Sequence, residues 1–221
     1  MFLVRNLKQI ATPVGRAGVR GAAMRELAVF DDAVIVVDGE RFAYAGRERE
    51  MPPEIRAAIS RDLDARGATA IPGFVDSHTH IPFSGYRESE FNRRLRGETY
   101  EQIAASGGGI ASTVRSTRAA TEGELVENVL ARTVTMARHG TTTAEAKSGY
   151  GLTFEDELKQ LRAVRAAAAR SPVRLVPTCL AAHEFPPERR GSESERQAWV
   201  DEIVESIVPA VARERLAVFC D

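Results

Sequence analysis

The chain has 221 residues, with 30 basic and 31 acidic side chains, a formal net charge of −1 and 43% hydrophobic residues. That length can bury a core for one domain plus a smaller one, and the composition is that of an ordinary globular protein. The balanced charge argues against nucleic acid or an acidic membrane surface as a partner, because either needs a clustered basic excess, and no apolar run approaches the length of a membrane span.

Residues 1–69 predict a β-rich region that carries no chemistry. The dipeptide Asp38-Gly39 separates two apolar runs, which is the strongest short-range signal for a β-hairpin. The region contains no histidine, cysteine or glycine-rich phosphate loop, so we predict a scaffold rather than a site. Strands are expected at residues 2–7, 33–37, 41–46 and 61–64, with one or two helical turns at 54–59.

The next stretch holds two of the four histidines of the chain, His78 and His80. An apolar run within residues 70–75 predicts a short buried strand. Because side chains two apart in a strand point the same way, both imidazoles should project together from its end, where they can bind one divalent metal ion. The alternative is a chance His-x-His, or one ring serving as a core histidine.

Beyond residue 80 the chain alternates between helices and strands, the pattern of a parallel sheet. Helices are expected at residues 99–105, 121–139, 153–169 and 193–212, the last one bent near Pro209, and strands at residues 141–145, 173–180 and 216–220. This alternation predicts an α/β fold that makes about half of a (β/α)8 barrel. In such barrels the active site lies at the C-terminal ends of the strands.

Distinctive polar residues follow each of the first three predicted barrel strands. Arg87 could clamp a carboxylate with its guanidinium, although an isolated loop arginine is usually just solvated. Tyr150 stands between two glycines and could be a packed turn aromatic, and His183 could be structural. His139, at a helix C-terminus, is expected to cap that helix. Lys147 is expected to be structural, and the glycines at 107–109 to form a mobile loop over the site.

Three motifs resemble a known family. Pro-Gly-Phe-Val-Asp-Ser-His-Thr-His at residues 72–80 resembles the first barrel strand of the amidohydrolase superfamily, whose members are metal-dependent hydrolases. Lys-Ser-Gly-Tyr-Gly-Leu at 147–152 and His-x-x-Pro-Pro-Glu at 183–188 resemble the imidazolonepropionases within it. The resemblance implies that residues 1–69 are part of a composite β-sandwich, and that residues 70–221 form the first half of the barrel.

The resemblance also implies a site and a reaction. His78 and His80 would bind one divalent or trivalent metal ion, zinc or iron, and Arg87, Tyr150 and His183 would bind the substrate. That substrate would be 4-imidazolone-5-propanoate, whose ring would be opened to N-formimidoyl-L-glutamate in histidine degradation. The catalytic residues and the remaining metal ligands would lie on later strands.

Alternatives stay open at this point. The chain could be another amidohydrolase, such as a deaminase or a different cyclic amidase, or an inactive half-barrel that only binds a ligand or partner, because fold alone does not choose a substrate. We expect a piece of a protein roughly twice as long, since a whole barrel needs about that length. With no signal peptide and two distant cysteines, we expect a cytoplasmic location and free thiols. A homodimer is left open.

Overall fold

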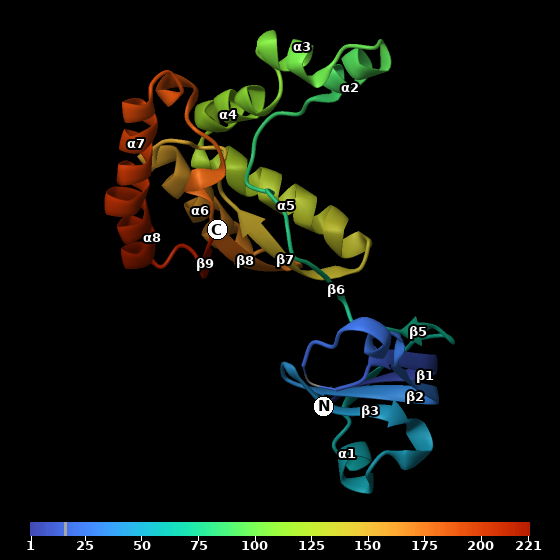
Figure 1. The fold of residues 1–221 in the computed structure, drawn as a ribbon. Coiled ribbons are helices and arrows are strands. Elements are labelled where there is room, and N and C mark those ends of the chain that lie inside the picture. Colours follow the sequence, from blue (N-terminus) through green and yellow to red (C-terminus); the bar gives the residue numbers. More distant parts are fainter. Residues whose placement is uncertain (16) are drawn as a thin grey trace. The chain divides into compact units, whose positions relative to one another are not determined.

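The computed structural model describes residues 1–15 and 17–221. Within it the chain divides into two compact units, Met1–Pro72 and Gly73–Asp221 (Figure 1).

The first unit is built on a five-stranded sheet in the order β3-β2-β1-β4, with β5 also pairing with β1. Its strands are β1 (Phe2–Pro13), β2 (Leu27–Asp38), β3 (Arg41–Arg47), β4 (Arg61–Asp64) and β5 (Thr69–Ala70). Short helical segments are η1 (Gly21–Arg25), η2 (Glu48–Glu50) and α1 (Pro53–Ala57). The predicted hairpin at Asp38-Gly39 is confirmed, because β2 and β3 pair antiparallel around it and Gly39 has a positive φ of 57°.

The first two strands are much longer than predicted. The β1–β2 ladder continues to the pair Pro13↔Leu27, far beyond the apolar residues that signalled each strand. In this outer part the ladder joins residues such as Gln9 and Asp31, whose side chains also hydrogen bond at 3.1 Å. Backbone pairing therefore extends the ribbon where the hydrophobic pattern gives no signal.

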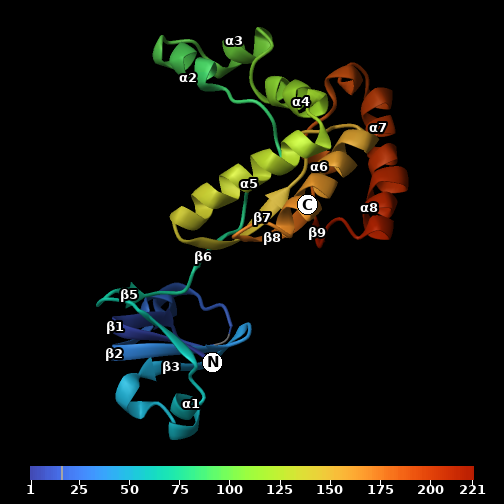
Figure 2. The same ribbon diagram turned by 180° about the vertical axis from the view of Figure 1, so that it is seen from behind.

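The second unit is an α/β structure around a parallel sheet in the order β6-β7-β8-β9. Its strands are β6 (Phe74–Asp76), β7 (Thr141–Lys147), β8 (Arg174–Cys179) and β9 (Phe219–Cys220). The helices are α2 (Glu88–Leu95), α3 (Tyr100–Ala105), α4 (Ile110–Ala119), α5 (Glu122–Arg138), α6 (Phe154–Ala168), η3 (Ala181–His183), η4 (Pro187–Arg189), α7 (Glu193–Glu202), η5 (Ile203–Ile207) and α8 (Val208–Glu214). Between one strand and the next the chain passes through one or more helices, and α5 and α6 pack side by side (Figures 1 and 2). This is a partial (β/α)8 barrel, as predicted.

Local signals explain where the long helices begin. Thr121 accepts from the Glu124 N–H while the Glu124 carboxylate accepts from the Thr121 N–H, which is the predicted capping box. The Thr153 side chain caps α6 by accepting from the Asp156 N–H, without the reciprocal bond of a capping box. The last predicted helix is different: it is divided into α7, the π-helical turn η5 and α8. Pro209, which has no N–H to donate, stands in the first turn of α8.

The first barrel strand is not buried as predicted. Phe74 and Val75 are 56% and 68% exposed, because β6 is an edge strand that pairs only with β7. At the other edge, β9 is shorter than the predicted strand at 216–220. The run at 107–109 leads directly into α4, with Gly109 as its N-cap residue.

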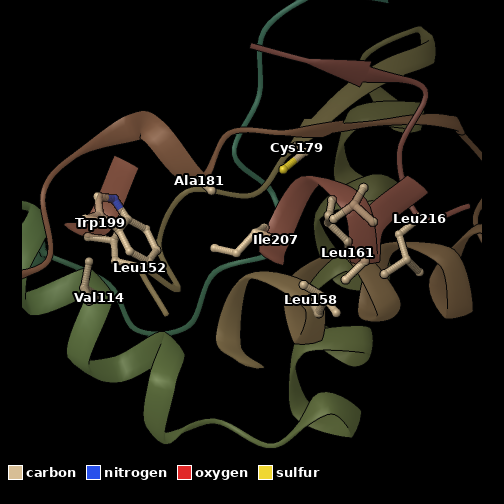
Figure 3. Close-up of a cluster of buried hydrophobic side chains, with 11 residues drawn as sticks. Val114, Leu152, Leu158, Leu161, Cys179, Ala181, Trp199, Ile207 and Leu216 are labelled. Carbon is tan, nitrogen blue, oxygen red and sulfur yellow. The ribbon is translucent and has the colours of Figure 1, made fainter. Parts of the chain in front are cut away.

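The largest hydrophobic cluster of the second unit lies between α6, β8 and the α7–α8 segment. Trp199, the single tryptophan of the chain, is 2% exposed there. Figure 3 shows Trp199, Leu152 and Val114 at one end of this cluster, so the loop that contains Leu152 is anchored in the core. Within the described residues no helix is both long and apolar enough to cross a membrane. Both cysteines, Cys179 and Cys220, are free.

Candidate active site

The two histidines predicted to bind metal follow β6 in an extended segment. Between them, the Thr79 hydroxyl donates to the Glu145 carbonyl, and the Thr79 carbonyl accepts from the Lys147 N–H at 2.9 Å. The rings of His78 and His80 flank this contact with their centroids 5.4 Å apart. Two imidazoles that share one tetrahedral zinc have centroids roughly 5 Å apart, because each Zn–N bond is about 2.1 Å. The spacing therefore fits a shared metal ion.

A backbone contact orients His80. Its Nδ1 lies 3.2 Å from the Ser148 carbonyl oxygen. Because a carbonyl only accepts, the proton belongs on Nδ1, and Nε2 keeps its lone pair. Burial, together with the neighbouring His183, lowers the pKa of His80 to about 4. The ring is therefore neutral at pH 7, which is the form that binds a metal.

Tyr150 and His183 converge on the same place from the ends of β7 and β8. The ring centroid of His80 lies 5.1 Å from that of Tyr150 and 4.6 Å from that of His183. The Tyr150 and His183 centroids are 5.5 Å apart. Burial raises the pKa of Tyr150, so its hydroxyl remains protonated and can donate a hydrogen bond. Three strand ends therefore bring three predicted site residues into contact.

The Arg87 side chain lines a cavity of about 260 Å³ beside these rings. Arg87, His80 and Tyr150 line it together with Phe83 and Tyr86, two aromatic residues of the loop between β6 and α2. The guanidinium also lies 3.8 Å from Glu90, a separation too long for a hydrogen bond. The cavity is thus a small space with an apolar wall and an exposed cation at its side.

The buried end of β7 carries an ion cluster. The Lys147 Nζ lies 3.0 Å from Glu145 Oε1 and 2.5 Å from Asp221 Oδ2. The hydrogen bond with Asp221 raises the pKa of Lys147, so the side chain stays a charged ammonium. Thr178 donates to the same Glu145 oxygen at 2.7 Å. Both carboxylates therefore pair with the Lys147 ammonium, an arrangement that agrees with a structural role for this lysine.

Comparisons with known proteins decide the family. Residues 69–214 match the Amidohydrolase family. The chain belongs to this family. It is 52% identical over 204 residues to an imidazolonepropionase of Symbiobacterium thermophilum, covering 91% of this chain and 47% of that protein. It is 48% identical over 220 residues to an imidazolonepropionase of Myxococcus xanthus, covering 100% of this chain and 51% of that protein. The chain thus spans about half the length of these curated relatives.

A solved structure supports the amidohydrolase fold. The 5-methylcytosine deaminase of Klebsiella pneumoniae, with 5-fluorocytosine bound, aligns with a TM-score of 0.53 over 93% of this chain and 41% of that chain. The sequence identity is 15%, so this likeness concerns the fold alone. It agrees with the partial barrel described above.

The sequence did not reveal every residue that shapes this amidohydrolase site. Arg132 of α5 donates through Nη1 to the carbonyls of Ile81 and Phe83 at 2.6 and 2.7 Å, and its guanidinium lies 3.6 Å over the Phe83 ring. It thereby fixes the loop that leads to Arg87. A lone arginine on an amphipathic helix carries no sequence signal for this role. Two polar residues of α6, Glu157 and Gln160, bind the loop that carries Tyr150 and were not predicted from the sequence either.

His139 is the C-cap residue of α5, and its Nδ1 lies 2.9 Å from the Thr135 carbonyl, which confirms its structural role. Across residues 1–15 and 17–221, no group of three or more histidine, cysteine, aspartate or glutamate side chains is arranged to hold a metal ion. The assignment of His78 and His80 as metal ligands therefore stays a prediction, supported by the spacing of their rings.

Proposed function

We propose that this amidohydrolase opens the ring of 4-imidazolone-5-propanoate. One water molecule adds across the ring amide, the C–N bond breaks, and N-formimidoyl-L-glutamate forms. The observation that supports this reaction is the cavity in which Arg87, His80 and Tyr150 meet, since it offers a cation beside neutral ring-binding groups. The relatives named imidazolonepropionase support the same substrate.

In this proposal Arg87 binds the propionate carboxylate. A guanidinium forms paired, charge-assisted hydrogen bonds with a carboxylate, and its charge does not vary with pH. The Tyr150 hydroxyl donates a hydrogen bond to the ring or to the carboxylate, because its raised pKa keeps the hydroxyl protonated. His183 faces both Tyr150 and His80 and contacts the ring carbonyl. Together these side chains orient the ring against the histidine pair.

His78 and His80 would hold the metal ion, zinc or iron. When bound, such an ion polarises a carbonyl and makes water a stronger nucleophile near neutral pH. The Ser148 carbonyl keeps the His80 Nε2 free for this purpose. Two imidazoles are fewer than the three protein ligands of a typical catalytic zinc site, so further ligands would have to come from the C-terminal half that the relatives possess.

The test compares residues 1–221 with an extended form, in which they are followed by the C-terminal half of the Symbiobacterium thermophilum relative. Ring opening is followed with 4-imidazolone-5-propanoate, before and after metal removal by a chelator. We expect turnover in the extended form, loss on chelation and recovery with zinc or iron, and little or no turnover by residues 1–221. Absence of turnover by a folded, metal-loaded extended form would contradict the proposal.

Arg87→Ala in the extended form tests the substrate class. Loss of a charge-assisted hydrogen bond of about 1.5–3 kcal/mol should raise KM roughly 10- to 100-fold, with a smaller change in kcat. Arg94→Ala, which removes an exposed arginine of the same helix region, is the matched control and should change neither constant. An unchanged KM in Arg87→Ala would show that Arg87 does not bind a substrate carboxylate, and it would favour a substrate without a carboxylate, such as a nucleobase.

A further inference from the structure

Two polar side chains lie on the core-facing side of α6. Glu157 and Gln160 are both 0% exposed. They stand one helical turn apart, next to the fully buried Leu158 and Leu161. A buried carboxylate or amide is costly unless every polar atom has a partner. The partners of these two side chains therefore show what the helix is built to hold.

The Glu157 carboxylate binds the backbone of the loop that follows β7. Its Oε2 accepts from the Gly149 N–H at 3.0 Å, and its Oε1 accepts from the Gly151 and Leu152 N–H groups at 2.9 and 2.8 Å. Among the residues that the structure describes, no lysine, arginine or histidine forms an ion pair with it. Burial raises the pKa of Glu157, and hydrogen bonds from Ser148 and these three N–H groups oppose that shift. All of these neighbours donate, so the ionised carboxylate matches them.

The Gln160 amide binds the remaining N–H of the same loop. Its Oε1 accepts from the Tyr150 N–H at 3.1 Å, and its Nε2 donates to the Pro82 carbonyl at 2.6 Å. Pro82 lies two residues beyond His80. One side chain therefore joins the loop of the metal-binding histidines to the loop of Tyr150.

Four successive backbone N–H groups, those of residues 149–152, are thus bound by two side chains of one helix. From the other side, Arg118 of α4 donates to the carbonyls of Gly151 and Leu152 at 2.6 and 2.9 Å. Gly149, Gly151 and Leu152 are buried, so solvent cannot satisfy their N–H groups and the Glu157 carboxylate does so instead. This loop has its backbone fixed on both sides, with Tyr150 at its centre.

We propose that Glu157 and Gln160 are positioning residues for substrate binding. By holding residues 149–152, they set the distance of the Tyr150 ring from His80 and its place in the wall of the cavity that Arg87 also lines. This inference rests on the proposed function for the identity of the substrate. Neither side chain lines the cavity, so both act through Tyr150 and not by touching the ring that is opened.

Glu157→Gln is the decisive variant. Whichever way the new amide is turned, its NH2 group faces a backbone N–H: that of Gly149 in one orientation, those of Gly151 and Leu152 in the other. An unsatisfied buried donor destabilises the structure around it, so amide exchange at residues 149–152 should accelerate about 10-fold or more. Glu155→Gln makes the same chemical change at an exposed site on the same helix and should leave the exchange unchanged.

The exchange experiment uses residues 1–221 and NMR detection of the four amides. Kinetics in the extended form provide the second readout: Glu157→Gln should raise KM for 4-imidazolone-5-propanoate about 10-fold, with a smaller effect on kcat, as expected for weaker substrate binding. If Glu157→Gln fails to fold, Gln160→Met removes the Tyr150 and Pro82 bonds with little change in volume. It should accelerate exchange at Tyr150 in particular and raise KM in the same way.

The outcomes separate this inference from the proposed function. Unchanged exchange at residues 149–152 in the folded variants would overturn the positioning role. Faster exchange with an unchanged KM, in an extended form whose parent is active, would overturn the link between this loop and substrate binding. If the parent itself turns over no substrate, the proposed function fails, and the exchange result still decides whether Glu157 and Gln160 hold the loop.

Discussion

A single added methyl group at Gly149 should destabilise the second unit strongly. Gly149 has a φ of +108°, outside the range that residues with a side chain adopt easily. A Cβ there would lie 2.9 Å from the His183 Cβ and 2.9 Å from the Leu180 carbonyl oxygen, and the latter belongs to the backbone and cannot turn aside. Strained backbone costs about 1–3 kcal/mol and overpacking about 1–3 kcal/mol more, so Gly149→Ala should lower the free energy of unfolding by roughly 2–6 kcal/mol.

Gly123→Ala is the matched control, because it makes the same change where a Cβ would meet no atom within 4 Å, in the first turn of α5. There alanine should stabilise the helix by up to about 1 kcal/mol. Urea unfolding followed by the fluorescence of Trp199, which is buried in the second unit, measures both. A Gly149→Ala variant within about 0.5 kcal/mol of the parent would refute the reasoning, because that is the range of an ordinary surface substitution.

Two further predictions use the same unfolding assay. Arg132→Lys should lower the free energy of unfolding by about 2–3 kcal/mol. The reason is that one ammonium cannot bind the Ile81 and Phe83 carbonyls and also cover the Phe83 ring, as the guanidinium does. A loss below about 0.5 kcal/mol would contradict this prediction. The hydrogen bond from Arg162 lowers the pKa of Glu214, so the stability from this pair is present above the ordinary carboxyl pKa of about 4.3 and is lost as the pH falls through the lowered value. Glu214→Gln should therefore lower the free energy of unfolding at pH 7, while at low pH the variant and the parent should be equally stable. The same difference in stability at both pH values would exclude a contribution from the ionised Glu214.

The fold could be predicted from the sequence where its signals are local. The capping box at Thr121 and the hairpin turn at Asp38-Gly39 involve residues at most a few positions apart, so the sequence contains both partners. Helix α4 could not be predicted in this way. Four of its ten residues are serine or threonine, which have low helix propensity, and it is stabilised by the burial of Val114 and Thr117. That burial depends on segments distant in the sequence.

The meeting of the predicted site residues followed from topology alone. Strands that run parallel end at one edge of a sheet, so His80, Tyr150 and His183 had to lie near one another once three strands were recognised. Glu157 and Gln160 could not be predicted in this way. Positions 157, 160, 161 and 164 of α6 have the spacing of a core-facing stripe. Glu157 and Gln160 interrupt the apolar residues of that stripe, and the sequence alone gives no reason for the interruption. Only the positions of the loop N–H groups reveal why they are polar.

These contacts also bear on how the site keeps its shape. The edge of a parallel sheet fixes where a strand ends, but it does not fix the loop beyond it. In this chain the loop after β7 is held by α6 and α4, and Arg118 of α4 also pairs with Glu188 at 2.9 Å, in the segment that follows His183. The loops after β6, β7 and β8 are therefore joined through side chains of two helices, Gln160 and Glu157 of α6 and Arg118 of α4, and none of these three lines the cavity. It follows that changes in the packing of α4 or α6 should alter substrate binding before they alter the sheet.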